Sequence, residues 1–289
     1  MKIKILIPVY NDWQSLFKLI DEIDKLQINE EYQISILIVN DASNHDRATE
    51  EKKFKNIQSI KILNMIKNQG HARCIATGLK YLFEKDDFEY VIPMDGDGED
   101  RPEEIRDFLS KIENLNNKPI VGERVKRSED LKFKICYVLH KVFTLVFTGQ
   151  LIKFGNFTCL PKSVVEKMIN EKATWNSFSG SLKKTERNLV SIPSVRGKRY
   201  FGPSKMSFYS LIKHSLSIIS VFRKTFLIRS ALFIILYILL IKSYASVITA
   251  IPIICLLVAV YLISNLSLRE NLDEFKNSLK QIKNIDIIQ

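Results

Sequence analysis

Residues 90–104 read YVIPMDGDGEDRPEE, and this stretch indicates the class of fold. An apolar run ends at Met94, six carboxylates follow from Asp95 to Glu104, and Pro102 stands where a helix would begin. Continuous apolar runs are typical of strands buried on both faces of a parallel sheet, and Pro is favoured in the first turn of a helix. The stretch therefore predicts a buried strand, a polar turn and a helix, the repeating unit of an α/β fold.

The same alternation of strands and helices extends over the first 121 residues. The expected strands span residues 3–9, 34–39, 60–64 and 90–94, with another beginning at 120, and the expected helices cover 16–26, 72–83 and 102–112. In such sheets ligands bind at the carboxyl ends of the strands. Polar clusters follow four of these ends, at residues 10–12, 40–41, 67–73 and 95–100. The pattern predicts one pocket to which all four contribute.

Positive charge is concentrated in one part of the chain. The formal net charge is +11, and between Lys183 and Arg229 there are eleven Lys or Arg residues against one acid, Glu186. Beside a membrane, such a block favours anionic headgroups or a lipid phosphate as its partner. The sequence has no helix-turn-helix pattern and no aromatic RNA-binding signature, so we expect no nucleic-acid partner.

An apolar segment follows the basic block. From Phe226 to Leu268 the only charged residues are Arg229 and Lys242. Residues 225–241 and 246–266 are long enough to span a bilayer, and the preceding stretch, 208–222, is amphipathic enough to lie along its surface. The alternative is a helical hairpin buried in a larger core. Lys and Arg flank both spans, which predicts by the positive-inside rule that both termini are cytoplasmic.

These features predict four regions in a protein of the cell (inner) membrane. They are a cytoplasmic catalytic domain (1–206), an interfacial helix (207–224), two transmembrane helices (225–268) and a cytoplasmic tail (269–289). The N-terminus reads as a first strand rather than a signal peptide, because it has no cleavage site. The four cysteines are scattered and are expected to be free thiols in a reducing compartment.

The acidic turn is not explained by calcium binding or by helix capping alone. An EF-hand loop beginning at Asp95 would need Gly at its sixth position and Glu at its twelfth, where this chain has Asp100 and Arg106. Acids in the first turn of a helix offset its dipole, which accounts for Glu103 and Glu104. Asp95 and Asp97 remain, and two such close carboxylates predict a divalent cation, Mg²⁺ or Mn²⁺, with Glu99 as a third candidate ligand.

Several motifs, in order, carry a family resemblance. IPVYND (7–12), VNDAS (39–43), KNQGHARCIATGL (67–79), MDGDGEDRPEE (94–104) and GERVKR (122–127) together resemble the family 2 inverting glycosyltransferases. RYFGPSKMS (199–207), followed by a membrane hairpin, resembles the polyprenyl-phosphate hexosyltransferases, the branch that is dolichol-phosphate mannose synthase-like. The resemblance implies an A-type glycosyltransferase fold, a Rossmann-like, mostly parallel sheet with helices on both faces.

The resemblance also implies roles for individual residues. Nucleotide binding is implied for Pro8, Tyr10, Asn11, Asp41, Lys67, Arg73 and Asp95. The metal ligands would be Asp95, Asp97 and Glu99. Lipid-phosphate binding is implied for Arg124, Arg127, Arg199, Ser204 and Lys205, and the catalytic set would be Asp97, Asp100 and Arg124.

Two departures from the family pattern affect the expected function. Asp12 and Asn40-Asp41-Ala42 differ from the usual acids on the nucleoside side, which leaves the donor open between UDP- and GDP-sugars. Asn156, in GNFTCL, stands where many relatives carry an Asp that is sometimes assigned as the base. A phosphate acceptor is already ionised at neutral pH and needs no such base.

The resemblance thus implies transfer of a hexose from a nucleotide sugar to a polyprenyl phosphate at the lipid bilayer, in cell-envelope polysaccharide synthesis. Two alternatives stay open. One is transfer to a lipid-linked glycan or another hydroxyl acceptor, and the other is a non-catalytic membrane scaffold that binds nucleotide sugars. The sequence is also compatible with a homo-oligomer.

Overall fold

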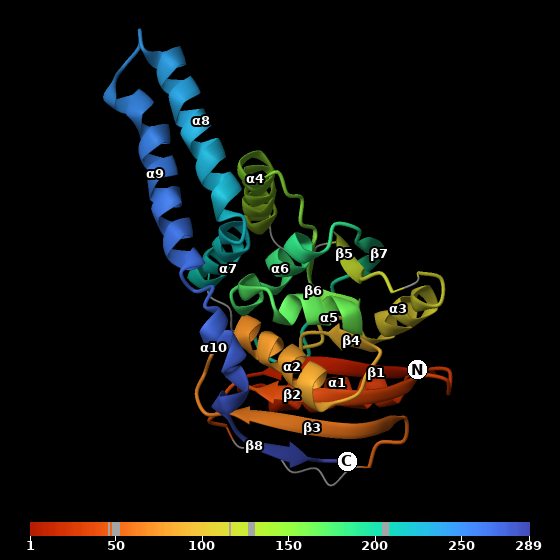
Figure 1. Cartoon of the computed structure of the whole chain (residues 1–289). Coiled ribbons are helices and arrows are strands. Elements are labelled where there is room, and N and C mark those ends of the chain that lie inside the picture. Colours follow the sequence, from red (N-terminus) through yellow and green to blue (C-terminus); the bar gives the residue numbers. More distant parts are fainter. Residues whose placement is uncertain (46, 48–52, 116, 127–130, 204–207) are drawn as a thin grey trace.

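A computed structural model describes the chain except residues 46, 48–52, 116, 127–130 and 204–207 (Figure 1). Strands and helices alternate along its first half, as the sequence predicts. The strands are β1 (Lys2–Val9), β2 (Gln33–Asn40), β3 (Ile57–Met65), β4 (Tyr90–Pro93), β5 (Ile120–Lys126), β6 (Phe154–Pro161), β7 (Val190–Val195) and β8 (Ile282–Ile287). The helices are α1 (Trp13–Asp24), α2 (His71–Lys85), α3 (Ile105–Ile112), α4 (Leu131–Thr148), α5 (Lys162–Ile169), α6 (Phe178–Thr185), α7 (Phe208–Ser220), α8 (Arg223–Ile241), α9 (Val247–Ser267) and α10 (Leu272–Lys276).

The eight strands form one mixed sheet in the order β7-β5-β6-β4-β1-β2-β3-β8. Pairing is parallel between β1 and its neighbours β2 and β4, between β2 and β3, and between β5 and β7. It is antiparallel wherever β6 or β8 takes part. Six strands therefore share one direction, and the predicted mostly parallel sheet is confirmed.

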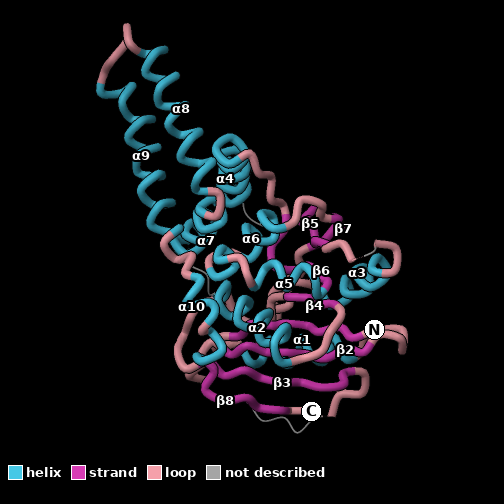
Figure 2. Tube along the Cα trace, viewed as in Figure 1, coloured by secondary structure: helices cyan, strands magenta, loops and turns pink. Residues whose placement is uncertain are grey.

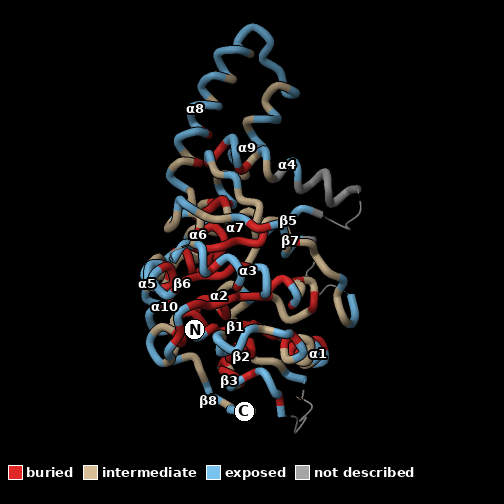
Figure 3. The backbone as a smooth tube through the Cα atoms, turned by 90° about the vertical axis from the view of Figure 1, so that its right-hand side faces the viewer, coloured by how far each residue is buried: buried red, intermediate tan, exposed pale blue. Residues whose placement is uncertain are grey.

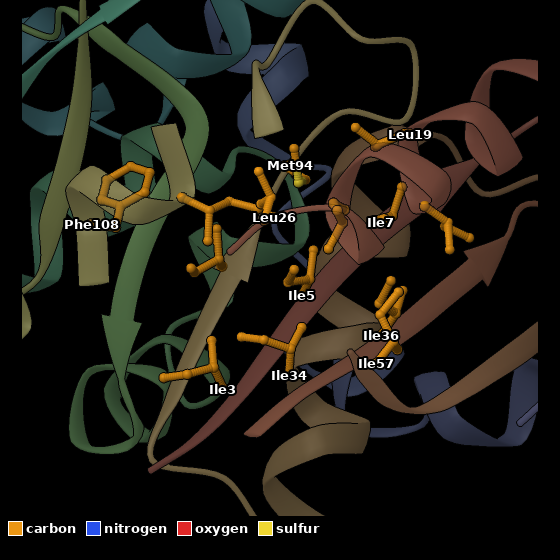
Figure 4. Close-up of a cluster of buried hydrophobic side chains, with 14 of the residues drawn as sticks. Ile3, Ile5, Ile7, Leu19, Leu26, Ile34, Ile36, Ile57, Met94 and Phe108 are labelled. Carbon is orange, nitrogen blue, oxygen red and sulfur yellow. The ribbon is translucent and has the colours of Figure 1, made fainter. Parts of the chain in front are cut away.

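Helices cover both faces of the sheet because successive strand residues point to opposite sides. On one face, Ile3, Ile5 and Ile7 of β1 pack with apolar residues of α1 and α3. Figure 4 shows part of this cluster, including Leu19 of α1 and Phe108 of α3. On the other face, Leu6 packs with residues of α2, α5 and α6. Strands β1, β2 and β4 form the buried centre of the molecule (Figure 3).

Helices α8 and α9 project from this body as a hairpin (Figures 1 and 2). They are long and apolar enough to cross a membrane by length and composition, with mean hydropathies of 2.1 and 2.7 over their most apolar windows, and most of their residues are exposed. Helix α7, in the predicted interfacial stretch, packs its C-terminal half against α6 and α9. The alternative of a hairpin buried in a larger core does not fit this exposure.

The residues after the hairpin return to the sheet. Strand β8 pairs antiparallel with β3, with Lys61 opposite Ile287. Helix α10 holds Phe275, whose ring stacks on Trp175 with centroids 5.4 Å apart. The sequence predicts a catalytic domain that ends at residue 206 and a cytoplasmic tail at 269–289. In the structure that tail adds the last strand of the sheet, which the irregular spacing of Ile282, Ile285 and Ile287 did not predict.

Candidate active site

The acidic turn lies at the carboxyl end of β4 and is stabilised by hydrogen bonds within the turn. The backbone N–H of Asp95 donates to Oδ2 of Asp100 at 2.9 Å, and the N–H of Glu99 donates to Oδ1 of Asp97 at 3.0 Å. Gly98 has a φ of +86°, a conformation that other residues rarely adopt. Asp100 is buried and therefore orients the turn, whatever else it does.

Each carboxylate on the open side of the turn has a cationic or imidazole partner from a distant segment. Nη1 of Arg199 lies 2.6 Å from Oδ2 of Asp97, and its Nη2 pairs with Asp12, which follows β1. Arg196 pairs with Glu99. Nε2 of His71, the first residue of α2, lies 2.9 Å from Oδ1 of Asp95. Four parts of the chain thus meet at one site.

Residues 196–201, which follow β7, run along the turn and are here called the arginine segment. The N–H of Gly197 donates to the carbonyl of Glu99 at 2.8 Å, and the N–H of Tyr200 donates to that of Asp97 at 2.9 Å. The Tyr200 ring packs on Gly98 so closely that a Cβ there would be 2.4 Å from the ring. Tyr200 also donates its hydroxyl to Glu22 of α1. Arg199 is therefore positioned by backbone pairing as well as by charge.

Mutual repulsion is visible in the pKa values of these acids. Burial, together with the nearby charge of Asp95, raises the pKa of Asp97 to about 6 and that of Asp100 to about 7. Burial also opposes ionisation of Asp95, but His71, Arg124 and Arg196 outweigh it and lower the pKa of Asp95. Three carboxyl groups so close together make a site that attracts cations.

The residues of the turn fit a divalent cation held by two carboxylates rather than three. Asp95 and Asp97 flank Gly96 and interact strongly with each other. Glu99 is paired with Arg196, and no group of three candidate metal ligands occurs among the residues that the structure describes. Hard cations such as Mg²⁺ commonly take one or two carboxylates and complete their shell with water and substrate phosphates. Asp95 and Asp97 are therefore enough to hold a hard cation, and Glu99 stays a predicted third ligand.

Arg124 and Asn156 complete the other side of the site. Strands β5 and β6, which carry them, are antiparallel neighbours. The guanidinium of Arg124 lies over Gly155 and close enough to lower the pKa of Asp95. Nδ2 of Asn156 is 3.5 Å from Oδ1 of Asp95. An Asp at position 156 would add a further carboxylate beside Asp95, whereas the amide adds a donor.

The residues expected to bind the nucleotide lie along the ends of β1, β2 and β3. Asn11, at the end of β1, accepts backbone N–H groups from Asn44 and His45. Asp41 is buried and accepts N–H groups from Gln69 at 2.6 Å and Gly70 at 2.9 Å, so it shapes the loop before α2. The other members of the set divide by exposure: Pro8 is buried, whereas Tyr10 and Lys67 are exposed.

Arg73, expected on the diphosphate side of the pocket, instead contacts α10 and Trp175. It pairs with Glu274 of α10 at 3.2 Å, and its guanidinium carbon lies 4.9 Å from the centre of the Trp175 ring. Arg127, Ser204 and Lys205, expected to bind the lipid phosphate, lie outside the described residues. Asp12 and His71 lie in the polar clusters expected to line the pocket, but the sequence assigned them no individual role. Arg196 was not expected at the site, and its position directly after β7 was the available signal.

Comparison with known proteins agrees with this geometry. A family model described as Glycosyl transferase family 2 matches residues 4–161, more than half of the chain. Undecaprenyl-phosphate 4-deoxy-4-formamido-L-arabinose transferase of Proteus mirabilis is 26% identical over 227 residues, covering 73% of this chain and 64% of the relative. The Klebsiella pneumoniae protein of that name is 26% identical over 226 residues, with the same coverage. The chain thus spans less than two thirds of these relatives.

Solved structures share the fold at low sequence identity. Glucosyl-3-phosphoglycerate synthase from Mycobacterium tuberculosis, solved with Mn²⁺, UDP-glucose and phosphoglyceric acid, is 11% identical with a TM-score of 0.55, covering 78% of this chain and 79% of that one. A mannosyltransferase from Pyrobaculum calidifontis, solved with GDP-Man and Mn²⁺, is 12% identical with a TM-score of 0.50, covering 96% and 75%. By the family model that it matches, the chain belongs to glycosyl transferase family 2.

Proposed function

We propose that this chain is a membrane-anchored inverting glycosyltransferase, which moves a hexose from a UDP- or GDP-sugar to a polyprenyl phosphate on the cytoplasmic face of the membrane. The observation that carries the proposal is the meeting of Asp97 with Arg199 at 2.6 Å. The resemblance assigns Asp97 to the donor side and Arg199 to the lipid phosphate. Their contact supports one site in which donor and acceptor lie side by side.

Residues of this chain would act mainly by positioning and by neutralising charge. Asp95 and Asp97 would hold the divalent cation, Mg²⁺ or Mn²⁺, which supplies charge to balance the departing nucleoside diphosphate. Arg199 and Arg124 would hold the lipid phosphate oxygen in line with the anomeric carbon, and Arg side chains suit phosphate because they offer paired donors. Holding two reactants in line is itself a large part of catalysis.

Arg199 must exchange partners for this to happen. In the structure its guanidinium is shared between Asp97 and Asp12. A cation on Asp97 and a phosphate beside it would replace one ion pair with two others, so the total charge stays balanced. The arginine segment is held by its backbone hydrogen bonds to Glu99 and Asp97. The exchange would therefore need only a movement of the Arg199 side chain.

The hairpin would place this site at the bilayer. Helices α8 and α9 are the proposed transmembrane helices, and α7 is the proposed interfacial helix. Because β8 follows the hairpin and pairs with β3, the chain on both sides of the hairpin belongs to one sheet. Two transmembrane helices fit this topology, since an even number of membrane crossings returns the chain to the side of the bilayer on which the sheet lies. The basic flanks favour the cytoplasm as that side.

The test is a transfer assay in membranes that contain the full chain. Labelled UDP- and GDP-sugars are incubated with undecaprenyl phosphate, and we expect chloroform-extractable label with one donor class, lost on adding EDTA and restored by Mg²⁺ or Mn²⁺. Label on a lipid-linked glycan but not on polyprenyl phosphate would assign the reaction to a hydroxyl acceptor instead. Nucleotide-sugar binding without turnover on any lipid would indicate a scaffold.

A further inference from the structure

A second site lies at the base of the hairpin, apart from the acidic turn. It is a hollow of about 360 Å³ lined by Gln150, Lys183, Lys184, Arg187 and Phe222. Its size falls within the range of about 300–1,000 Å³ that small-molecule sites occupy. Three of its five lining residues are cationic, and none is acidic. None of the five belongs to the site residues discussed above.

Two of the three cations of this hollow have no ion-pair partner in the described part of the chain. Lys184 pairs with Glu171 at 2.9 Å, whereas Lys183 and Arg187 form no ion pair with any residue that the structure describes. The nearest acid in sequence, Glu186, pairs with Lys167 at 2.6 Å. Two positive charges therefore face the hollow without a counter-charge.

Helix capping explains only part of this arrangement. Lys183 and Lys184 stand in the last turn of α6, where cations complement the helix dipole. Arg187 lies two residues beyond the last residue of α6, Thr185, outside the last helical turn. Capping also does not explain why the lysines share a hollow with Gln150 and Phe222. A bound anion accounts for all of these features.

The hollow lies next to helices α4 and α8, which carry exposed apolar residues. Phe222 immediately precedes α8, and Gln150 follows α4. The two helices are joined there, because Nη1 of Arg229 in α8 donates to the carbonyl of Val146 in α4 at 2.8 Å. Val142 and Val146 of α4 are 54% and 52% exposed. A ligand here would have its anionic end among the cations and apolar surface beside it.

We infer that this hollow binds the headgroup of an anionic phospholipid of the surrounding bilayer. Lys183 and Arg187 pair with the lipid phosphate, Gln150 can donate to it, and the acyl chains lie along α4 and α8. Cations at a membrane surface are attracted to anionic lipids in this way. The inference uses only the membrane placement in the proposed function, and it concerns a structural lipid distinct from donor and acceptor.

Native mass spectrometry of the full chain in uncharged detergent tests the assignment without any sugar donor. Short-chain phosphatidylglycerol and phosphatidylcholine of equal chain length are each added to the protein, and the amount of bound lipid is compared. The wild type is expected to retain more phosphatidylglycerol than phosphatidylcholine. Lys183→Gln combined with Arg187→Gln is expected to weaken that binding about ten- to thirtyfold. Lys25→Gln with Lys111→Gln, an equal loss of charge at exposed positions on α1's end and α3, is the control and should bind as wild type does.

Four outcomes would overturn the inference. They are equal retention of the two lipids, equal loss of binding in the control, full competition by soluble glycerol phosphate, and loss of undecaprenyl phosphate binding in the double variant as large as the loss of phosphatidylglycerol. The last would assign the hollow to the acceptor. Should the double variant not fold, Arg187→Gln alone carries the test, with an expected loss of about fivefold. Transfer activity is not the readout, so failure here leaves the proposed reaction untouched.

Discussion

The acidic turn and the basic hollow differ in whether their charged side chains have ion-pair partners within the protein. In the turn, Asp97, Glu99 and Asp95 each have a partner supplied from a distant segment. In the hollow, Lys183 and Arg187 have no partner among the described residues. A self-paired site binds ligand by exchanging its internal partners, which adds selectivity at a cost in affinity. A site with unpaired charge binds any suitable counter-ion directly.

The largest expected effect comes from removing a carboxylate of the turn. Asp97→Asn keeps the shape but removes a charge from the cation site and from the ion pair with Arg199. Transfer should fall about a thousandfold, because a bound metal contributes several kcal/mol and about 1.4 kcal/mol corresponds to a factor of ten. Rates are measured at saturating donor, with added Mn²⁺.

Asp107→Asn is the matched control, since Asp107 is an exposed acid on α3. It should transfer sugar at the wild-type rate, and thermal melts should show both variants folded. Near-normal turnover of Asp97→Asn would remove the acidic turn from the mechanism and would end the comparison drawn above.

The second prediction concerns Arg199, the cation proposed to leave Asp97 and bind the lipid phosphate. Arg199→Gln removes the cation shared by Asp97 and Asp12. We expect about a hundredfold loss in kcat/KM for polyprenyl phosphate, with the KM for the lipid raised more than the KM for the donor, because loss of a charge-assisted phosphate contact costs a few kcal/mol. Lys198→Gln, an exposed neighbour with the same charge change, should have little effect.

An Arg199 variant could instead lose activity through misfolding of the turn. Metal binding separates the two explanations. If Arg199 only competes for Asp97, Mn²⁺ binding followed by electron paramagnetic resonance should be at least as tight in Arg199→Gln as in wild type. Weaker binding of Mn²⁺ would show that the arginine builds the site rather than occupying it.

The third prediction isolates the contact between the arginine segment and the turn. Gly98 and Gly70 both have positive φ, +86° and +90°, so Ala at either position is strained. A Cβ at Gly98 would also meet the Tyr200 ring at 2.4 Å, whereas a Cβ at Gly70 meets nothing within 4 Å. Gly98→Ala should therefore lower stability by about 1–3 kcal/mol more than Gly70→Ala does, the usual range for overpacking.

Chemical unfolding of both variants measures that difference, and Tyr200→Ala should remove it by making room for the methyl group. An equal cost at the two glycines would mean that Tyr200 moves aside freely. The arginine segment would then be loosely attached, and its pairing with the turn would follow from charge alone.

The sequence predicted the sheet better than the site, and the reason is physical. Continuous apolar runs such as 34–39 encode burial locally, so the first four strands and the start of the fifth can be predicted from neighbouring residues, whereas β6, β7 and β8 were not expected. Arg196 and Arg199 reach the turn only because β7 is parallel to β5, a pairing across the whole domain. Arg73 is similar: its partner Glu274 follows the hairpin, and no local pattern connects the two.

The C-terminal strand shows the same limit. Residues 282–287 alternate weakly and carry three polar side chains, as an edge strand does. Without its partner β3 such a segment resembles a solvated tail. Motif spacing singled out Asp95 and Asp97 because the two carboxylates lie on one short turn, whereas the groups that pair with them are brought there by the topology of the sheet.

The smallest expected effect comes from an ion pair far from the acidic turn. It tests whether a partly buried carboxylate there also depends on partners from distant segments, as Asp95 and Asp97 do. Asp86 accepts from Lys4 and Lys61, each at 3.0 Å, and Lys4 is only 8% exposed. Burial opposes ionisation of Asp86, but the two lysines outweigh it and lower its pKa below 3.8. Asp86→Asn leaves Lys4 without its partner and should cost about 1–2 kcal/mol, between the values for exposed and fully buried pairs.

The pH dependence of that cost has a definite sign. Because the pKa of Asp86 is lower in the folded protein, its contribution is complete above the unfolded pKa and is lost as pH falls through the folded one. The difference in unfolding free energy between wild type and Asp86→Asn should therefore be constant at neutral pH and shrink below about pH 4. Urea titrations of both proteins across this range measure it, with Asp107→Asn as control, since Asp107 is an exposed acid on α3. A difference that grows toward low pH would mean that the pKa of Asp86 is raised in the folded protein, so that burial outweighs the two lysines.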